Sequence, residues 1–159
     1  STLLEIKEKK QLVKQEQFKK IKKTKNDLKI INKMLQTDPQ NLNLLLAKAS
    51  MAAIIQDIET EIETLKKIIK INPITNVKSL LAQAYLRKND GIVNEFIKKL
   101  IDEVLSEKPK DPGANFILAK YLNQNGNKNK SRNLLLKILK NLDDKGPWHQ
   151  IYKDELNIK

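Results

Sequence analysis

The regular placement of proline constrains this chain more than any other sequence feature. Asp38-Pro39, Asn72-Pro73 and Asp111-Pro112 are followed by Pro147, and these four prolines stand 34, 39 and 35 residues apart. Proline ends helices because it lacks an amide hydrogen and its ring clashes with the preceding turn. The intervals between the prolines carry apolar residues at helical spacing and no alternating strand pattern. The chain is therefore predicted to be all-α, with two helices in each interval.

The apolar spacing places the helices of each pair. The first helices are predicted over 42–55, 77–91 and 114–127, and the second helices over 58–73, 92–105 and 129–142. Small residues in the first helices allow close packing of the pair, and these are Ala47, Ala49, Ala52, Ala53, Ala82 and Ala119. Gly91 and Gly126 stand where the chain turns between two helices. Residues 26–39 read as the second helix of an earlier pair.

A 34-residue antiparallel helix pair with a turn is the unit of the tetratricopeptide repeat. One pair cannot bury its own apolar face, so neighbouring pairs must stack. We predict a tetratricopeptide-like right-handed superhelix of antiparallel helix pairs; the alternative is an irregular helical bundle whose proline spacing is accidental. The expected organisation is a lysine-rich helical extension over 1–25 and a repeat domain over 26–159, with repeats at about 42–73, 74–112 and 113–146 and a capping helix at about 147–157.

The charge of the chain is strongly positive but unevenly distributed. The net charge is +12, of which residues 1–36 carry +7 and residues 113–159 carry +5. Only Arg87 and Arg132 of the 31 cations are arginine. Proteins that read nucleic acids depend heavily on the arginine fork, so the lysine bias favours a solvated surface, and no nucleic-acid partner is expected. No apolar stretch approaches the roughly 18 residues that a membrane span needs.

The residues that carry most enzyme chemistry are scarce. The absence of cysteine excludes disulfides, thiol catalysis and cysteine metal sites. The single histidine, His149, is interpreted as a surface residue, because metal sites and catalytic triads need further ligands or partners beside it. The acidic run Asp57, Glu59, Glu61 and Glu63 has helical spacing and is interpreted as a solvated helix face. We predict a non-enzymatic protein without catalytic residues, metal site or cofactor.

A protein-binding groove is the function that a stacked helix-pair architecture favours. The first helix of each pair lines the concave side, and the repeat register places ten residues there: Asn43, Leu46, Ser50, Ser79, Gln83, Leu86, Arg87, Phe116, Lys120 and Asn123. This mixture of apolar and polar side chains suits an amphipathic helix or an extended segment. Its cations suit an acidic peptide face or a terminal carboxylate. Trp148 is expected to seal the open apolar edge of the last pair.

Residues 91–156 carry a characteristic series of features: Gly91, Val93, the Pro109–Pro112 linker, Ala119, Gln124, Gly126, the leucine-rich helix Leu135–Leu142 and the Pro147-Trp148 pair. In this series the stretch resembles the C-terminal half of the CcmI/CycH-type family of cytochrome c biogenesis proteins. With the pattern of residues 28–47 the resemblance extends over about 26–156. The chain departs from that family at Glu61, where alanine is usual, and at His149, where arginine is usual.

The resemblance implies a specific role. It implies a chaperone that captures apocytochrome c, by its C-terminal segment, and delivers it to the components of the haem-ligation complex. It also implies a location in the bacterial periplasm, with membrane contact only through an inner-membrane anchor preceding residue 1. The residues alone leave two alternatives open: a generic tetratricopeptide adaptor, or a basic, nucleic-acid-associated helical protein in the cytoplasm. Phosphate binding by the latter would weaken steeply with salt.

Overall fold

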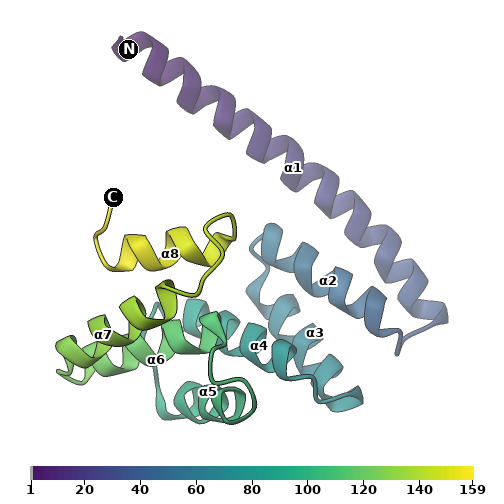
Figure 1. The fold of residues 1–159 in the computed structure, drawn as a ribbon. Coiled ribbons are helices and arrows are strands. Elements are labelled where there is room, and N and C mark those ends of the chain that lie inside the picture. Colours follow the sequence, from purple (N-terminus) through teal and green to yellow (C-terminus); the bar gives the residue numbers. More distant parts are fainter. Residues whose placement is uncertain (1) are drawn as a thin grey trace. The chain divides into compact units, whose positions relative to one another are not determined.

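The computed structural model describes residues 2–159, and within them the chain forms eight α-helices and no strand (Figure 1). The helices are α1 (Leu3–Thr37), α2 (Leu42–Ile54), α3 (Ile58–Ile71), α4 (Thr75–Lys88), α5 (Glu95–Glu107), α6 (Pro112–Gln124), α7 (Lys128–Leu139) and α8 (Pro147–Glu155). The all-α prediction is confirmed. The predicted and observed ends of α2 to α8 differ by up to three residues, because the prediction counts the turn residues 89–91 and 125–127 with the preceding helices and residues 92–94 with α5.

The N-terminal region is helical, as expected. Most of the lysine-rich extension over 1–25 and of the helix expected over 26–39 lies in one continuous helix, α1, which runs from Leu3 to Thr37 and is about 52 Å long at a rise of about 1.5 Å per residue. A capping box begins it, because the Glu5 amide donates to Thr2 Oγ1 (3.3 Å) and the Thr2 amide donates to Glu5 Oε2 (3.1 Å). These reciprocal bonds satisfy two amides that would otherwise be unpaired, so the helix starts at a defined residue.

The chain divides into two compact units, residues 1–64 and residues 65–159, which are described separately. In the first unit α1 packs against α2. Five of the six residues of α1 that are buried or half-buried follow the 3–4 spacing of one helix face: Ile21, Thr24, Leu28, Ile31 and Leu35. The sixth, Asp27, is half-buried beside this face. Since α2 has 13 residues and α1 has 35, α2 covers only part of α1.

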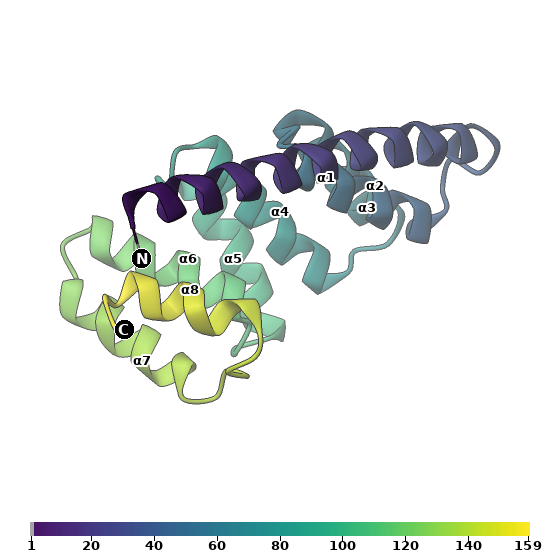
Figure 2. The same ribbon diagram turned by 90° about the horizontal axis from the view of Figure 1, so that it is seen from above.

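In the second unit each helix from α4 to α8 packs against the next (Figure 2). One apolar cluster joins α4, α5 and α6 through Ala82, Leu86, Val93, Ile97, Ile101, Val104, Ala114 and Ile117. A second cluster joins α6, α7 and α8 through Ala119, Leu135, Ile138, Tyr152 and Leu156. Helix α6 contributes to both clusters, so it is the central element of this unit.

The helices α2, α4, α6 and α8 all end in the same way. Each is followed by a residue with positive φ, and these residues are Gln56 (60°), Asp90 (53°), Gly126 (84°) and Asn157 (55°). In each case the next amide donates to a carbonyl five residues earlier, as in a Schellman motif. Gly91 (φ 81°) and Gly126 confirm the predicted turn glycines, since glycine adopts this conformation without steric cost. The shared ending marks these four helices as equivalent members of successive pairs, and it includes the last helix, α8.

The prolines lie between successive helices, as predicted. Pro112 and Pro147 occupy the first turns of α6 and α8, where a missing amide hydrogen costs nothing. Asp111 caps α6, since its Oδ2 accepts from the Ala114 amide at 2.8 Å. The Asp-Pro pair therefore starts the following helix as well as preventing continuation of the preceding one.

The acidic run of α3 is only partly solvated. Asp57 is exposed and caps α3: its Oδ2 accepts from the Thr60 hydroxyl (2.6 Å) and its Oδ1 from the Thr60 amide (3.2 Å), which together lower the pKa of this carboxyl. Glu59 and Glu63 are also exposed. Glu61 is buried, with 5% of its surface exposed, so the prediction of a solvated face is wrong at this position.

Candidate functional site

Helices α4, α6 and α8 each contribute exposed or half-buried side chains to the surface of the second unit. Leu80 and Gln83 come from α4, Phe116 and Lys120 from α6, and Trp148 from α8. We call these five residues the first-helix surface. Helix α4 packs against α6, and α6 against α8, so the surface crosses three helices that end alike.

A hydrogen-bonded network fixes Gln83 at the α4–α6 contact. Its Nε2 donates to Ser79 Oγ (3.2 Å), and the Ser79 hydroxyl donates to Asp111 Oδ2 (2.7 Å). The same carboxylate caps α6 through the Ala114 amide. The Gln83 amide is thus held by a chain of polar contacts that starts at the helix cap, which lowers the entropy that a ligand would have to remove.

Gly113 allows α4 and α6 to approach closely at this point. A Cβ atom on Gly113 would lie 2.4 Å from Gln83 Nε2 and 2.9 Å from Ser79 Oγ. Both distances are shorter than van der Waals contact, so any larger residue at Gly113 would displace the Gln83 side chain.

Aromatic rings cover the contact between α6 and α8. The Phe116 ring centroid lies 5.8 Å from that of Trp148 and 5.9 Å from that of Tyr152. Trp148 and Tyr152 meet edge to face at 6.2 Å, a favoured aromatic geometry. Trp148 is only half-buried and packs against the apolar cluster of α6, α7 and α8, which confirms its predicted role of sealing that edge. Its remaining surface is accessible from solvent.

Tyr152 anchors α8 beneath this aromatic group. The side chain is fully buried, and its hydroxyl donates to the Pro112 carbonyl at 2.6 Å. Burial, with a smaller contribution from Asp111, raises the pKa of the Tyr152 phenol well above its ordinary value. The phenol therefore remains a neutral donor and ties α8 to the first turn of α6.

Lys120 supplies the positive charge of the first-helix surface. Its Nζ lies 4.9 Å from the Phe116 ring centroid and 3.2 Å from Glu155 Oε1. Both side chains of this ion pair remain partly exposed, and such pairs contribute only about 0–1 kcal/mol. Lys120 can therefore exchange Glu155 for a carboxylate of a ligand at little cost.

Of the predicted groove residues, the structure brings Phe116 and Lys120 into contact, and it places Gln83 of α4 against Gly113 of α6, the helix that carries both of them. Arg87 and Asn123 are exposed, each one turn further along the same sides of α4 and α6. In the first unit, Asn43 and Ser50 are exposed on α2 and Leu46 is half-buried.

Two of the predicted groove residues are buried. Ser79 is 4% exposed and donates to Asp111, while Leu86 is 7% exposed and belongs to the cluster of α4, α5 and α6. Neither side chain lies on the exposed surface. The exposed stripe of α4 runs through Leu80 and Gln83, so the predicted register is one residue off at Ser79 and at Leu86.

Sequence reasoning missed Leu80, Gly113 and the contribution of Trp148 to an accessible surface. Leu80 is 44% exposed, an unusual state for a leucine between buried neighbours. The 3–4 spacing from Leu80 through Gln83 to Arg87 would have identified this stripe. Pro147-Trp148 opens a helix as Asp111-Pro112 does, which would have shown that α8 belongs with the first helices.

The part of the chain that the structure describes holds no group of three or more histidine or acidic side chains able to bind a metal ion. Among the same residues, no helix has both the length and the apolar character needed to cross a membrane. No model of a known protein family matches this chain, and no curated protein matches it either.

Proposed function

We propose that this chain is a tetratricopeptide-type protein-binding domain whose first-helix surface holds a segment of another polypeptide. The observation that carries the proposal is the packing of α4 against α6 and of α6 against α8, with accessible side chains on all three helices. Three equivalent helices present a fixed amide (Gln83), a cation (Lys120) and accessible apolar groups. Tetratricopeptide domains bind their ligands with the corresponding first helices.

The pairing of the helices supports the tetratricopeptide assignment and the right-handed superhelix that it includes. Helices α2, α4, α6 and α8 begin about 35 residues apart, and all four share the Schellman ending. Ala82, Ala114 and Ala119 are almost fully buried where neighbouring helices meet, as small residues are in closely packed pairs.

The chemistry of the surface indicates what kind of segment it fits. Phe116, Trp148 and Leu80 offer apolar contact area, and the Gln83 amide can pair with a main-chain group. Lys120 can bind an acidic side chain or a terminal carboxylate. An amphipathic helix that carries aliphatic residues and one carboxylate meets all three requirements.

We further propose apocytochrome c as the partner, on the basis of the family resemblance in residues 26–156. In this proposal the domain is a chaperone that captures the C-terminal segment of apocytochrome c and delivers it to haem ligation. The corresponding location is the bacterial periplasm, with tethering to the inner membrane.

The direct test is calorimetric titration of the purified chain with a C-terminal apocytochrome c peptide and with a scrambled peptide. We expect a dissociation constant of tens of micromolar or lower for the native peptide and no binding of the scrambled one. Lys120→Glu should weaken binding at least tenfold. Lys98→Glu is the matched control, because Lys98 is also half-buried and lies over an aromatic ring, that of Tyr121.

The outcomes test the proposed partner and the proposed binding surface separately. Absence of binding at tens of micromolar contradicts the apocytochrome assignment. Binding that is equally weakened by the Lys120 and Lys98 variants contradicts the assignment of the first-helix surface itself.

A further inference from the structure

One face of α1 carries a row of lysines that the proposed function does not use. Eight residues follow one another at intervals of three or four along this face: Leu4, Lys7, Gln11, Lys14, Phe18, Lys22, Lys25 and Lys29. All eight side chains are exposed. We call this row the lysine stripe, and it is about 33 Å long from Lys7 to Lys29 at a rise of about 1.5 Å per residue.

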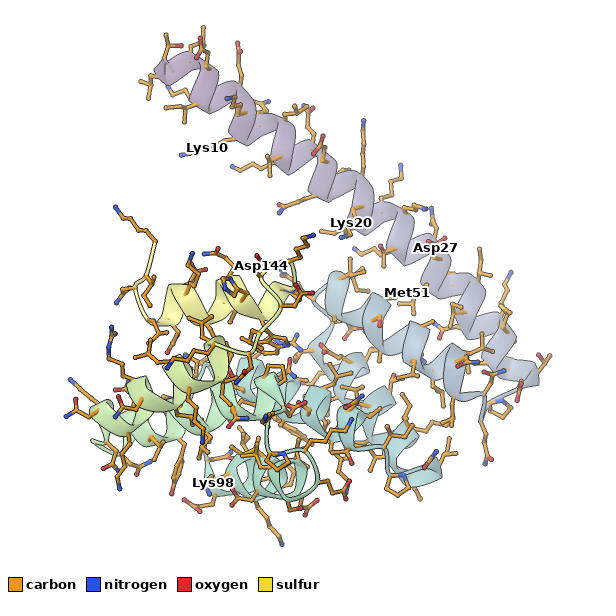
Figure 3. All side chains as sticks on the ribbon, in the orientation of Figure 1. Lys10, Lys20, Asp27, Met51, Lys98 and Asp144 are labelled. Carbon is orange, nitrogen blue, oxygen red and sulfur yellow. The ribbon has the colours of Figure 1, made fainter. Side chains whose placement is uncertain are left out.

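The other faces of α1 differ from the lysine stripe. At 100° per residue, all four acidic residues of α1 fall outside the stripe: Glu5, Glu8, Glu16 and Asp27. The other six lysines of the helix also fall outside it, so the stripe carries five positive charges and no negative one, whereas the remaining faces together carry a net charge of +2 (six lysines less four acids). Five of the six buried and half-buried residues of α1, including Thr24 and Leu28, lie on a third face about 110° away by the same geometry. Packing against α2 therefore leaves the stripe accessible along its whole length. Figure 3 shows the α1 side chains, among them the labelled Lys10 and Lys20, extending outward from the helix.

Two large apolar side chains lie within the lysine stripe. Leu4 is 66% exposed and Phe18 is 70% exposed. Phe18 sits in the middle of the row, in a shallow open depression that Lys7, Lys14 and Lys19 also border. Exposed apolar groups set among cations fit a partner that has anionic groups at its surface and an apolar layer directly beneath.

We propose that the lysine stripe docks on the anionic surface of a phospholipid bilayer, with lysines at the headgroup phosphates and Phe18 and Leu4 in the interface. A straight row of five lysines without an acidic residue among them matches a flat anionic surface, and each lysine near such a surface adds attraction. Lysine is a compact point charge and suits a diffuse field of phosphates, whereas defined bidentate sites use arginine. Nucleic acid is the less suitable anion, because its phosphates cover no hydrocarbon layer for Leu4 and Phe18.

The test is sedimentation of the full chain with vesicles of phosphatidylglycerol and phosphatidylcholine mixed in equal amounts, and with vesicles of phosphatidylcholine alone. We expect binding to the anionic vesicles, weakening with salt, and at least tenfold weaker binding to the neutral ones. The stripe variant Lys7→Glu/Lys14→Glu/Lys22→Glu should lose at least tenfold in affinity. The matched control is Lys9→Glu/Lys20→Glu/Lys23→Glu, which makes the same change in net charge at exposed positions outside the stripe and should lose less than threefold.

Removing the apolar groups tests the second half of the proposal. Phe18→Ala should weaken binding to anionic vesicles severalfold, while Leu12→Ala, at an exposed position outside the stripe, should not. Equal losses in the two charge variants would show a response to net charge alone and overturn the proposal. Tighter binding to a duplex or single-stranded oligonucleotide, with the same dependence on the stripe, would assign this surface to nucleic acid instead. Circular dichroism of each variant checks that α1 remains helical.

Discussion

Helices α1 and α6 use their residues in opposite ways. Helix α1 has 35 residues, of which one, Thr24, is buried. Helix α6 has 13 residues, of which five are buried, and it joins two apolar clusters. The number of buried residues in these two helices therefore follows their packed neighbours and not their length. The long helix contributes mainly accessible surface, and the short one holds the second unit together.

The largest expected loss in the free energy of unfolding comes from truncating a buried residue of α6. Ile117 is fully buried, so Ile117→Ala should lower the free energy of unfolding by about 2–5 kcal/mol, through lost burial and the cavity left behind. Urea unfolding followed by Trp148 fluorescence measures this change. Leu12→Ala on α1, where the leucine is 57% exposed, should change it by less than about 0.5 kcal/mol. Similar losses in both variants would show that α1 is packed as closely as α6.

The end of α6 is expected to be the next most sensitive point. Gly126 has φ of 84°, and a Cβ atom there would meet nothing within 4 Å, so a substitution changes the backbone energy without a clash. Gly126→Ala should cost about 1–2 kcal/mol in the free energy of unfolding, because alanine disfavours this conformation. Gly126→Asn should cost less, since asparagine tolerates it better. An equal loss in the free energy of unfolding for the alanine and asparagine variants would argue against a positive φ at residue 126.

The hydrogen bond from Tyr152 of α8 to Pro112 of α6 should contribute about 1 kcal/mol to the free energy of unfolding. Tyr152→Phe removes the hydroxyl that donates to the Pro112 carbonyl, and loss of such a hydrogen bond typically costs about 0.5–1.5 kcal/mol. Urea unfolding at neutral pH measures the loss. An unchanged free energy of unfolding would mean that water replaces the phenol at Pro112.

The same tyrosine should make stability depend on alkaline pH. Below pH 10.0, the ordinary tyrosine pKa, the phenol is protonated in both the folded and the unfolded chain. Above it the unfolded tyrosine ionises while the folded one stays protonated, because burial raises its pKa. The free energy of unfolding should then fall by up to about 1.4 kcal/mol per pH unit. Tyr152→Phe lacks this contribution, so the stability difference between wild type and variant should narrow as pH rises above 10.

The smallest effect is expected at the start of α1. Thr2→Ala removes the capping box that begins the helix, a change worth about 0.5–2 kcal/mol where a cap supports a packed helix. The first turns of α1 are exposed, so only these turns should fray. Faster amide exchange over the first turns, with the same urea midpoint, is the expected result. A lowered midpoint would show that the start of α1 is coupled to the rest of the first unit.

The sequence was sufficient to predict the helices wherever proline or glycine turn residues border a segment with apolar residues at helical spacing. Asp111-Pro112 and the apolar stripes of α5 and α7 place the helices of the second unit close to their observed ends. Residues 1–25 were expected to continue the helix of residues 26–39, although their apolar spacing is weak. The continuity of α1 comes from lysine and glutamine, which favour helices without leaving an apolar pattern.

The candidate site was harder to predict, because polarity does not always reveal burial. Ser79 is polar yet buried, because Asp111 and Gln83 satisfy its hydroxyl. Leu80 is apolar yet exposed on the neighbouring face of α4. A pattern of apolar and polar residues assigns these two positions the wrong way round. Only the packing of α4 against α6, made possible by Gly113, decides which face is accessible.

The side-chain amide of Gln124 restricts the movement of the helix pairs in the second unit. Gln124, at the end of α6, donates from Nε2 to the Gly91 carbonyl (2.7 Å) and accepts from the Val93 amide at Oε1 (3.0 Å). These two hydrogen bonds tie the turn between α4 and α5 to the C-terminal end of α6. Neighbouring pairs cannot slide past each other without breaking both bonds. A peptide bound across α4 and α6 would thus contact two helices at a fixed distance from each other. Local unfolding of one helix would be expected to release the other.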